Sequence, residues 1–337
     1  MRKFRSFAVL IFAGTASLSF GADEPIAQTA EPLPLQLEVK IPLGDARGRI
    51  DHMAVDLPRQ RLFVAELGND SVGVVDLKGR KVVHTITGLK EPQGVGYVPS
   101  TDTLYVANAG DGSVRLFQGT DYAAAGQIDL GEDADNIRVD IAANRVFVGY
   151  GKGALAMIDG ARRSKIGDIP LKAHPESFQL DRGTKQIFVN LPDARAIAVI
   201  DGVTGQQRAS WPIRDAGGNF PMALDEEARQ VLTVFRNPAE LSVFSMQNGA
   251  TVASTAICGD SDDVFMDAKR HRVYVSCGEG FVDVLDTQEG AFKRMAHIPT
   301  VAGARTSLFV PELDRLFVAV RANAGERAAI WVFRPLP

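Results

Sequence analysis

The residues best suited to chemistry are polar side chains that recur at one position of an internal repeat. Counting back twelve residues from the marker residue of each unit, defined below, gives Asp51, Gln93, Asp135, Glu176, Phe220, Asp262 and Arg305. The next position gives His52, Gly94, Asn136, Ser177, Pro221, Asp263 and Thr306. Carboxylates about 5 Å apart repel by roughly 3 kcal/mol at an effective dielectric constant near 20, so a group of them needs a cation, a histidine or a raised pKa.

This variety of polar side chains predicts a binding site. We expect its rim to hold Asp51, His52, Gln93, Asp135, Asn136, Glu176, Asp262, Asp263 and Arg305. Polar side chains that only contact channel water are the competing interpretation. If these residues only contacted water, Ser, Thr and Gly would be sufficient. The variety of polar side chains therefore favours a binding site.

A divalent cation is one candidate ligand. Its oxygen ligands would be Glu176, Asn136, Asn219 and Asp263, which suit a hard ion such as Ca²⁺. With that ion bound, Glu176 or Asp51 could act as a base and His52 or His174 as an acid on a lactone or ester. Structural, hydrogen-bonded histidines are the alternative. No nucleophile elbow, phosphate loop, CxxCH or HExxH motif occurs, so the sequence favours a binding or scaffold protein over an enzyme.

Loops on the same side of the fold supply further polar residues. We expect Asn108, Tyr150, Asn190, Arg236, Asn237 and Arg321 to enlarge the pocket. Arg236 and Arg321 together with Arg305 could form an anion-binding sector opposite the acidic residues. Ordinary surface arginines are the alternative.

A repeat of about 42 residues must position these side chains. Its marker is the third residue of a short apolar segment such as RLFV or TLYV, at Phe63, Tyr105, Phe147, Phe188, Leu232, Tyr274 and Phe317. The spacings are 42, 42, 41, 44, 42 and 43 residues, and each unit carries alternating segments for four short strands. This pattern predicts an all-β, seven-bladed β-propeller in which the first strand of each blade lines a central channel.

The two ends of the chain predict how the ring closes. The last unit supplies only three strands, whereas LQLEVKIPL at residues 35–43 is a strand without a unit. Pairing this N-terminal strand as the outer strand of the last blade would hide two sheet edges. An open solenoid would leave both facts unexplained. We therefore expect one propeller domain over residues 35–337.

The N-terminus predicts export. Arg2, Lys3 and Arg5 precede an uncharged apolar stretch at residues 7–20, which is typical of a cleaved signal peptide over residues 1–22, followed by a flexible linker at 23–34. The sequence contains no later stretch long enough to span a membrane. We therefore expect a periplasmic or secreted protein, and a monomer.

The net charge limits the kinds of partner that this protein can have, and the cysteine content indicates its redox state. The net charge of −4 becomes about −7 without the signal peptide, which argues against a nucleic-acid surface. Cys258 and Cys277 are the only cysteines, and an oxidising compartment would permit a bridge between them. A free, buried Cys277 is the alternative.

The units resemble YVTN-type propellers of the exported bacterial YncE-like group. The likeness is carried by RLFVAELGNDSVGVVDL from Arg61, TLYVANAGDGSVRLF from Thr103 and RVYVSCGEGFVDVLD from Arg272, and it extends over all seven units. It implies a propeller that binds a small ligand, a metal ion or a protein partner at the polar channel mouth. The metal ligands proposed above also resemble those of gluconolactonase-type propellers, which implies a metal-dependent lactonase or lyase as the alternative function.

Overall fold

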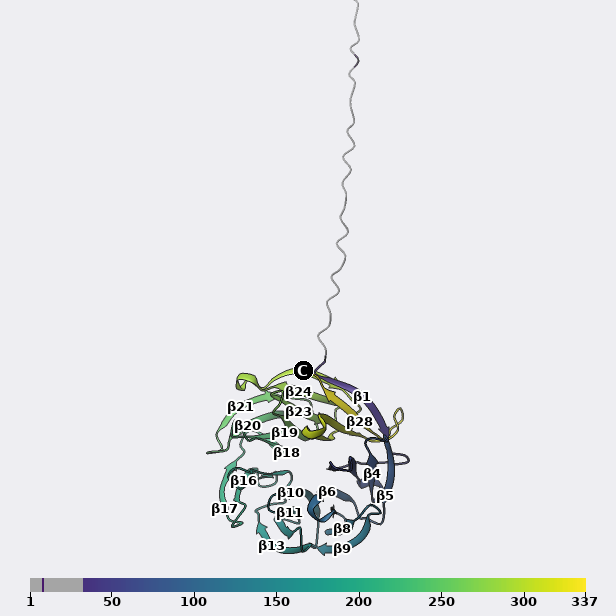
Figure 1. Cartoon of the computed structure of the whole chain (residues 1–337). Helices are drawn as coiled ribbons and strands as arrows, with labels where there is room; N and C mark the ends of the chain where they lie inside the picture. The colour runs from purple at the N-terminus through teal and green to yellow at the C-terminus, as the bar shows by residue number, and fades with distance from the viewer. Residues whose placement is uncertain (1–7, 9–32) are drawn as a thin grey trace, which may run out of the picture. The chain divides into compact units, whose positions relative to one another are not determined.

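Seven four-stranded antiparallel sheets follow one another along the chain and form a ring (Figure 1). The computed structural model describes Ala8 and residues 33–337. The predicted seven-bladed propeller is confirmed. Apart from Ala8 and residues 33–34, the predicted signal peptide (1–22) and linker (23–34) lie outside the described residues. No helix in the described part of the chain is long and apolar enough to cross a membrane.

Each blade runs from an inner first strand to an outer fourth strand. Blade one holds β2 (Met53–Asp56), β3 (Arg61–Glu66), β4 (Ser71–Asp76) and β5 (Lys81–Ile86). Blade two holds β6 (Pro92–Val98), β7 (Thr103–Asn108), β8 (Ser113–Gln118) and β9 (Ala123–Asp129). Blade three holds β10 (Ala134–Asp140), β11 (Arg145–Tyr150), β12 (Ala154–Asp159) and β13 (Ser164–Pro170).

The remaining blades repeat this order. Blade four holds β14 (Phe178–Leu180), β15 (Gln186–Leu191), β16 (Ala196–Asp201) and β17 (Gln207–Pro212). Blade five holds β18 (Gly217–Asp225), β19 (Gln230–Asn237), β20 (Ala239–Ser245) and β21 (Thr251–Ala256). Blade six holds β22 (Ser261–Asp267), β23 (Arg272–Cys277), β24 (Phe281–Asp286) and β25 (Lys293–Pro299). Blade seven holds β26 (Thr306–Val310), β27 (Arg315–Val320), β28 (Ala329–Pro335) and β1 (Leu35–Pro42).

Short helical turns occupy some connections between these strands. They are η1 (Leu67–Asn69), η2 (Pro99–Thr101), η3 (Gln288–Gly290) and η4 (Pro311–Leu313). Each spans three residues, so the strands alone carry the architecture.

The seven marker residues lie in the second strands and all are buried. They are Phe63, Tyr105, Phe147, Phe188, Leu232, Tyr274 and Phe317. The residue that immediately precedes each second strand has a left-handed backbone, at Gln60, Asp102, Asn144, Lys185, Arg229, His271 and Asp314. A left-handed residue at this point belongs to a common tight hairpin connection, so every blade makes the same turn between its first two strands.

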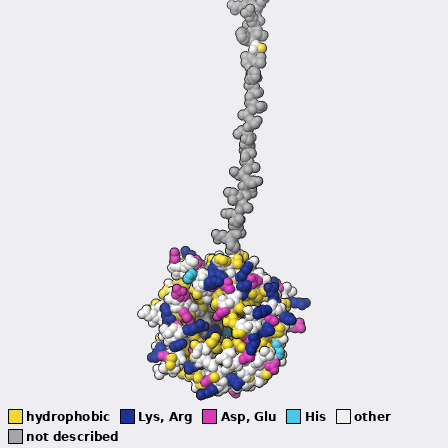
Figure 2. Space-filling view, viewed as in Figure 1, with side chains coloured by type: hydrophobic (Ala, Val, Ile, Leu, Met, Phe, Trp, Pro, Cys, Tyr) yellow, Lys and Arg dark blue, Asp and Glu magenta, His cyan; other side chains and the backbone are white. Residues whose placement is uncertain are grey.

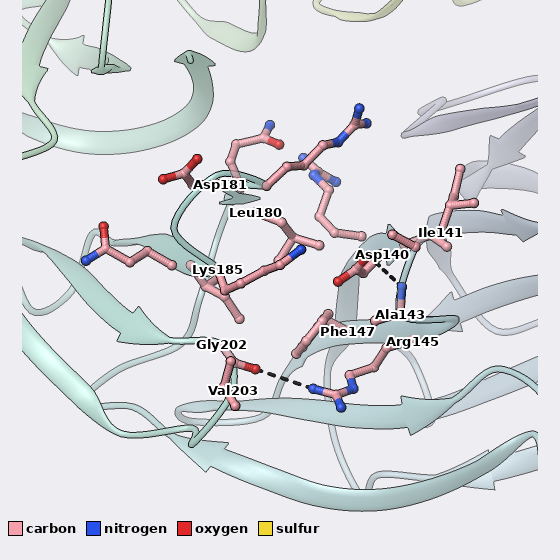
Figure 3. Close-up of a pocket in the computed structure, with 17 residues that line it drawn as sticks. Asp140, Ile141, Ala143, Arg145, Phe147, Leu180, Asp181, Lys185, Gly202 and Val203 are labelled. Atoms are coloured by element: carbon pink, nitrogen blue, oxygen red, sulfur yellow. Dashed lines mark hydrogen bonds between the residues drawn. The ribbon is translucent and has the colours of Figure 1, made fainter. Parts of the chain in front are cut away.

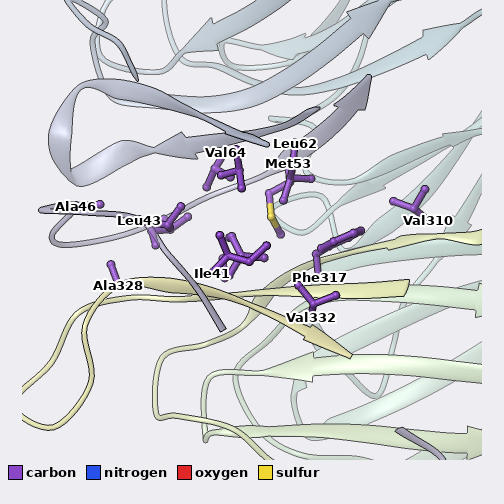
Figure 4. Packing of buried hydrophobic residues seen from close by; sticks show 14 residues of the cluster. Ile41, Leu43, Ala46, Met53, Leu62, Val64, Val310, Phe317, Ala328 and Val332 are labelled. Atoms are coloured by element: carbon purple, nitrogen blue, oxygen red, sulfur yellow. The ribbon is translucent and has the colours of Figure 1, made fainter. Parts of the chain in front are cut away.

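The N-terminal strand closes the ring as predicted. β1 pairs antiparallel with β28, and Leu35 lies opposite Pro335 while Ile41 lies opposite Ile330. Ile41 and Leu43 pack with Met53 of blade one and Phe317 of blade seven in one buried cluster (Figure 4). The last blade is thus assembled from both ends of the chain, and its inner face is sealed against the first blade.

The first strands enclose a cavity at the centre of the ring. Its volume is about 320 Å³, and its walls come from β2, β6, β10, β14, β22 and β26, together with His52. The space-filling view shows the propeller hollowed at its centre, with basic and acidic side chains on the surrounding surface (Figure 2). Residues at the start of each first strand therefore reach one mouth of this channel.

Candidate binding site at the channel mouth

Backbone irregularities shape the mouth. The pairing between first and second strands shifts register near the mouth in β6, β10, β18 and β22. A β-bulge places two residues of one strand opposite a single residue of its partner and redirects their side chains. This explains why the two adjacent positions counted from the marker, such as Asp135 and Asn136, both contribute to the site.

Blades one and six meet around His52. Its Nε2 atom lies 3.7 Å from Oδ1 of Asp51, and its Nδ1 atom lies 4.0 Å from Oδ1 of Asp263. Asp51 also pairs with Arg49 at 2.7 Å. Oδ2 of Asp263 accepts a 2.7 Å hydrogen bond from the backbone amide of Ser307. Two carboxylates from separate blades are therefore brought within reach of one imidazole.

Blades three and four form a second acidic group around His174. The imidazole Nε2 atom lies 3.9 Å from Oδ2 of Asp135, and Nδ1 lies 3.5 Å from Oδ2 of Asp133. The same Nδ1 atom is 2.6 Å from the carbonyl oxygen of Gly151. Asp135 is buried, and its Oδ1 atom has no hydrogen-bond partner among the described residues. A buried carboxylate oxygen of this kind is an acceptor that a ligand could use.

The arginines at the mouth do not form the predicted anion-binding sector. Arg236 contacts Asp262 at 2.5 Å, and Arg305 contacts the same carboxylate at 3.0 Å. Arg305 also contacts Asp260 at 2.8 Å. The prediction was wrong because these two side chains reach across to blade six and neutralise its carboxylates, so they lie within the acidic region and not opposite it.

One arginine of the channel wall was missed by the sequence analysis. Arg138 lies two residues after Asn136 on β10, and its guanidinium donates to Oδ1 of Asn136 at 3.1 Å and to Oγ of Ser177 at 3.2 Å. Burial lowers the pKa of Arg138, while Asp263 and Asp135 act in the opposite direction. The i, i+2 spacing from Asn136 was the signal available in the sequence, because alternate residues of a strand share a face.

Burial and like charge shift the titration of the mouth carboxyls. Burial raises the pKa of Asp51 to about 7, against the opposing charge of Arg49. Burial and the charge of Asp135 raise the pKa of Glu176 to about 8. The pKa values of Asp262 and Asp263 are also raised, in both cases mainly by burial.

The pKa values of the two histidines are shifted in opposite directions. Burial lowers the pKa of His52. Burial also acts to lower the pKa of His174, but the nearby carboxylate of Asp135, the hydrogen bond to the carbonyl of Gly151 and the charge of Asp133 outweigh it and raise that pKa to about 9. At neutral pH the structure therefore holds a neutral imidazole between Asp51 and Asp263 and a charged imidazole beside Asp135.

Several residues predicted to enlarge the pocket are used inside the fold. Asn108 is fully buried, and its side chain accepts from the amide of Lys90 and donates to the carbonyl of Ser113. Asn190 is also fully buried and donates to the carbonyls of Phe220 and Pro221. For both asparagines the prediction was wrong, because these amides satisfy buried backbone groups.

The other predicted residues lie in more open surroundings. The hydroxyl of Tyr150 donates to Asp168 of the outer strand β13 at 2.9 Å. Asn237 and Arg321 are exposed, and Gln93 is half-buried at the inner edge of blade two. Gly94 lies against the backbone carbonyl of Asp135, which leaves no space for a Cβ atom at this position of the ring.

The predicted metal ligands form hydrogen bonds with other protein groups. Asn219 is buried, and its amide donates to Oδ1 of Asn190 and to the carbonyl of Ala196. Asn136 accepts from Arg138, and Asp263 accepts from Ser307. Within residues 33–337, no group of three or more His, Cys, Asp or Glu side chains is arranged to hold a metal ion.

The two cysteines form a disulfide in blade six. Cys258 precedes β22 and Cys277 ends β23, and their Cα atoms lie 5.8 Å apart. The backbone amide of Cys258 also donates to Oδ2 of the buried Asp283 at 2.8 Å. The disulfide therefore fixes the loop that leads directly to Asp260, Asp262 and Asp263.

Comparisons with known proteins identify the fold. No protein-family model matches the sequence, and no curated protein matches it. A chain of hydrazine synthase from Kuenenia stuttgartiensis superposes with a TM-score of 0.75 at 16% identity, covering 86% of this chain and 96% of that one. A chain of the mitotic checkpoint complex superposes with a TM-score of 0.76 at 12% identity, covering 95% of this chain and 98% of that one. At these identities the likeness shows the fold alone: this chain is a seven-bladed β-propeller.

Proposed function

We propose that this chain is an exported binding protein that recognises a ligand with a positively charged group, such as an ammonium group, at the channel mouth. The observation that carries the proposal is the presence at the mouth of carboxyls with raised pKa values, among them the buried Asp51 and the half-buried Glu176. Asp51 and Glu176 hold protons near neutral pH because no cation offsets their burial sufficiently. A cationic ligand would supply that charge and allow both groups to ionise.

Three further features support export and the family assignment. The sequence begins with a basic and then apolar segment of the signal-peptide type. The disulfide between Cys258 and Cys277 suits an oxidising compartment. The seven repeats of about 42 residues carry the motifs that resemble YVTN-type, YncE-like propellers. Localisation of an epitope-tagged protein by cell fractionation, with mass measurement of the mature N-terminus, tests this part of the proposal.

A thermal-shift comparison tests the binding site. The mature protein is titrated with putrescine, Ca²⁺ and Mg²⁺, with acetate as an anionic control. We expect a concentration-dependent rise in Tm with at least one cation and none with acetate. The rise should be lost in Asp135→Asn and Glu176→Gln and retained in Glu226→Gln, which removes an exposed carboxyl from the turn between β18 and β19. A response that is equal in all four proteins would remove these residues from the site.

The second candidate is a metal-dependent lactone or ester hydrolase at the same mouth. The observation that favours it is the pair Glu176 and His174, because their pKa values of about 8 and 9 leave an ionised Glu176 as base and a protonated His174 as acid between those two pH values. Hydrolysis of a lactone panel is measured with added Ca²⁺ and with EDTA. Turnover that needs the ion and is lost in Glu176→Gln but not in Glu226→Gln would favour this candidate, and absence of turnover under both conditions would exclude it for the lactones tested.

A further inference from the structure

A second cavity lies between blades three and four, at the end of the propeller opposite the mouth. Its volume is about 670 Å³, which is within the usual range for small-molecule sites. It is lined by the turns that follow β10, β14 and β16, and these turns join strands at the end remote from the mouth. Figure 3 shows Asp140, Ile141 and Arg145 on one side of the cavity and Leu180, Asp181 and Lys185 on the other.

Basic side chains dominate the charge of this cavity. Its lining includes Arg138, Arg145, Arg182 and Lys185. Within residues 33–337, none of these four forms an ion pair with a carboxylate. Arg145 donates only to the carbonyl of Gly202, at 3.3 Å, and Arg138 bonds to neutral oxygens of Asn136, Ile137 and Ser177.

The acidic residues of the cavity do not balance this charge. Asp181 is already paired with Arg229, which lies outside the lining, at 2.9 Å. Asp140 accepts a hydrogen bond from the backbone amide of Ala143 (Figure 3). Arg145, Arg182 and Lys185 are therefore cations of this cavity that no carboxylate within residues 33–337 pairs with, in a chain whose net charge is −4. Electrostatic complementarity therefore favours an anionic occupant.

The same cavity exposes apolar surface. Ile141 and Val203 stand at its rim with 66% and 73% of their surfaces exposed, and these are the two most exposed large hydrophobic residues in the described part of the chain. Phe147, Leu180 and Ile187 form its deeper wall. An exposed apolar rim over a buried apolar wall is the arrangement expected where a ligand covers hydrophobic surface.

We propose that this cavity binds a small amphipathic anion, with an apolar body against Phe147, Leu180 and Val203 and a carboxylate or sulfonate beside Arg182 and Lys185. Arg182 and Lys185 are exposed at the rim, Arg138 and Arg145 are half-buried, and Phe147 and Ile187 of the apolar wall are buried. A ligand that enters from solvent would keep its charged group at the rim and bury its apolar part. This site opens at the end of the propeller opposite the acidic mouth, although Arg138 lines both cavities, and it would bind ligands of the opposite charge.

Calorimetric titration of the mature protein with matched probes tests the proposal. The probes are 1-naphthaleneacetate, its neutral amide 1-naphthaleneacetamide, and acetate, which lacks the apolar body. We expect the naphthalene acid to bind at least tenfold more tightly than the amide, a difference of about 1.4 kcal/mol. We expect acetate to bind more weakly than either. Failure of the naphthalene acid to bind at millimolar concentration, or equal affinity for acid and amide, would overturn the proposal.

A double variant with a matched control locates the site. In Arg182→Gln/Lys185→Gln, affinity for the acid should fall at least tenfold and approach that for the amide. The control Lys78→Gln/Arg80→Gln removes two exposed basic residues from the turn between β4 and β5, and Arg80 has the same left-handed backbone as Lys185. The control should bind both probes as the unmodified protein does. Equal loss in both double variants would mean that net charge, and not this cavity, attracts the anion.

The apolar rim is tested separately. Val203→Ser should weaken binding of the acid and the amide by similar factors, because both place the same ring system against that side chain. All of these substitutions lie at exposed positions, so each variant is expected to keep the Tm of the unmodified protein. If Val203→Ser left both affinities unchanged, the apolar part of the proposal would be wrong.

Discussion

At the scale of single residues, burial of ionisable side chains determines their protonation at the mouth. Asp51 and Glu176 have pKa values raised to about 7 and about 8, from ordinary values of 3.8 and 4.5. The folded protein therefore binds protons more tightly than the unfolded chain between those limits, and its stability falls as pH rises through them. His174, raised from 6.5 to about 9, contributes stability that is present below pH 6.5 and is lost as pH rises through 9.

Glu176→Gln should therefore change the pH dependence of stability. The amide of the variant cannot ionise. At high pH the unmodified protein is destabilised because it must hold a charged carboxylate at a desolvated position, and the variant is not. We expect the two proteins to be nearly equal in stability at pH 5, and the variant to gain on the order of 1–3 kcal/mol in relative stability by pH 9. Urea unfolding at a series of pH values measures this difference. Glu226→Gln should show no such trend, and a flat difference for Glu176→Gln would contradict the raised pKa.

Residue types and repeat spacing predicted much of this group of side chains. Asp51, Asp135, Glu176 and Asp262 recur at one position of the repeat, and Asp263 stands at the next position. The pairing of Arg305 and Arg236 with Asp262 could not be predicted, because long side chains reach across blades in ways that sequence distance does not encode. Arg138 lies further along β10 than Asp135 and Asn136, so the two polar positions of the repeat do not include it.

At the scale of strands and loops, the bulges and the disulfide set the geometry of the mouth. Four of the first strands shift register close to where their polar residues begin. The strands themselves were predictable from alternation and from the marker residues, whereas the bulges were not. A bulge depends on pairing with the neighbouring strand, and an isolated alternating pattern carries little information about it.

Removal of the disulfide should destabilise blade six. The bridge closes a loop of 19 residues, for which the chain-entropy model gives a stabilisation of about 3 kcal/mol. We expect Cys258→Ser/Cys277→Ser to shift the midpoint of guanidinium unfolding to lower denaturant concentration, and the unmodified protein in reductant to behave in the same way. An unchanged midpoint in both cases would show that the bridge contributes no stability.

At the scale of the whole molecule, closure of the ring depends on the N-terminal strand. The sequence predicted this closure because one strand was missing at the end of the chain and one was left over at its start. Ile41 of β1 is almost fully buried between blades one and seven, whereas Leu37 of the same strand is 39% exposed. These two residues provide a matched pair for testing how much the closing strand contributes.

Ile41→Ala should cost about 2–5 kcal/mol of stability, the usual range for a large-to-small change in a packed core. Leu37→Ala should cost much less, since its side chain already meets solvent. Chemical unfolding of both variants measures the contrast, and size-exclusion chromatography reports whether the opened edge causes association. Equal and small effects at the two positions would show that β1 does not seal the ring in solution.

The proposed cationic ligand binds among protonated carboxyls at the mouth. Such binding must release protons, because a positive charge lowers the pKa values of Asp51 and Glu176. Titration calorimetry at pH 7 in buffers of different ionisation enthalpy counts those protons for the cation found by thermal shift. We predict a net release on the order of one proton, reduced in Glu176→Gln and unchanged in Glu226→Gln. Binding without proton release, or release that is the same in both variants, would contradict the account.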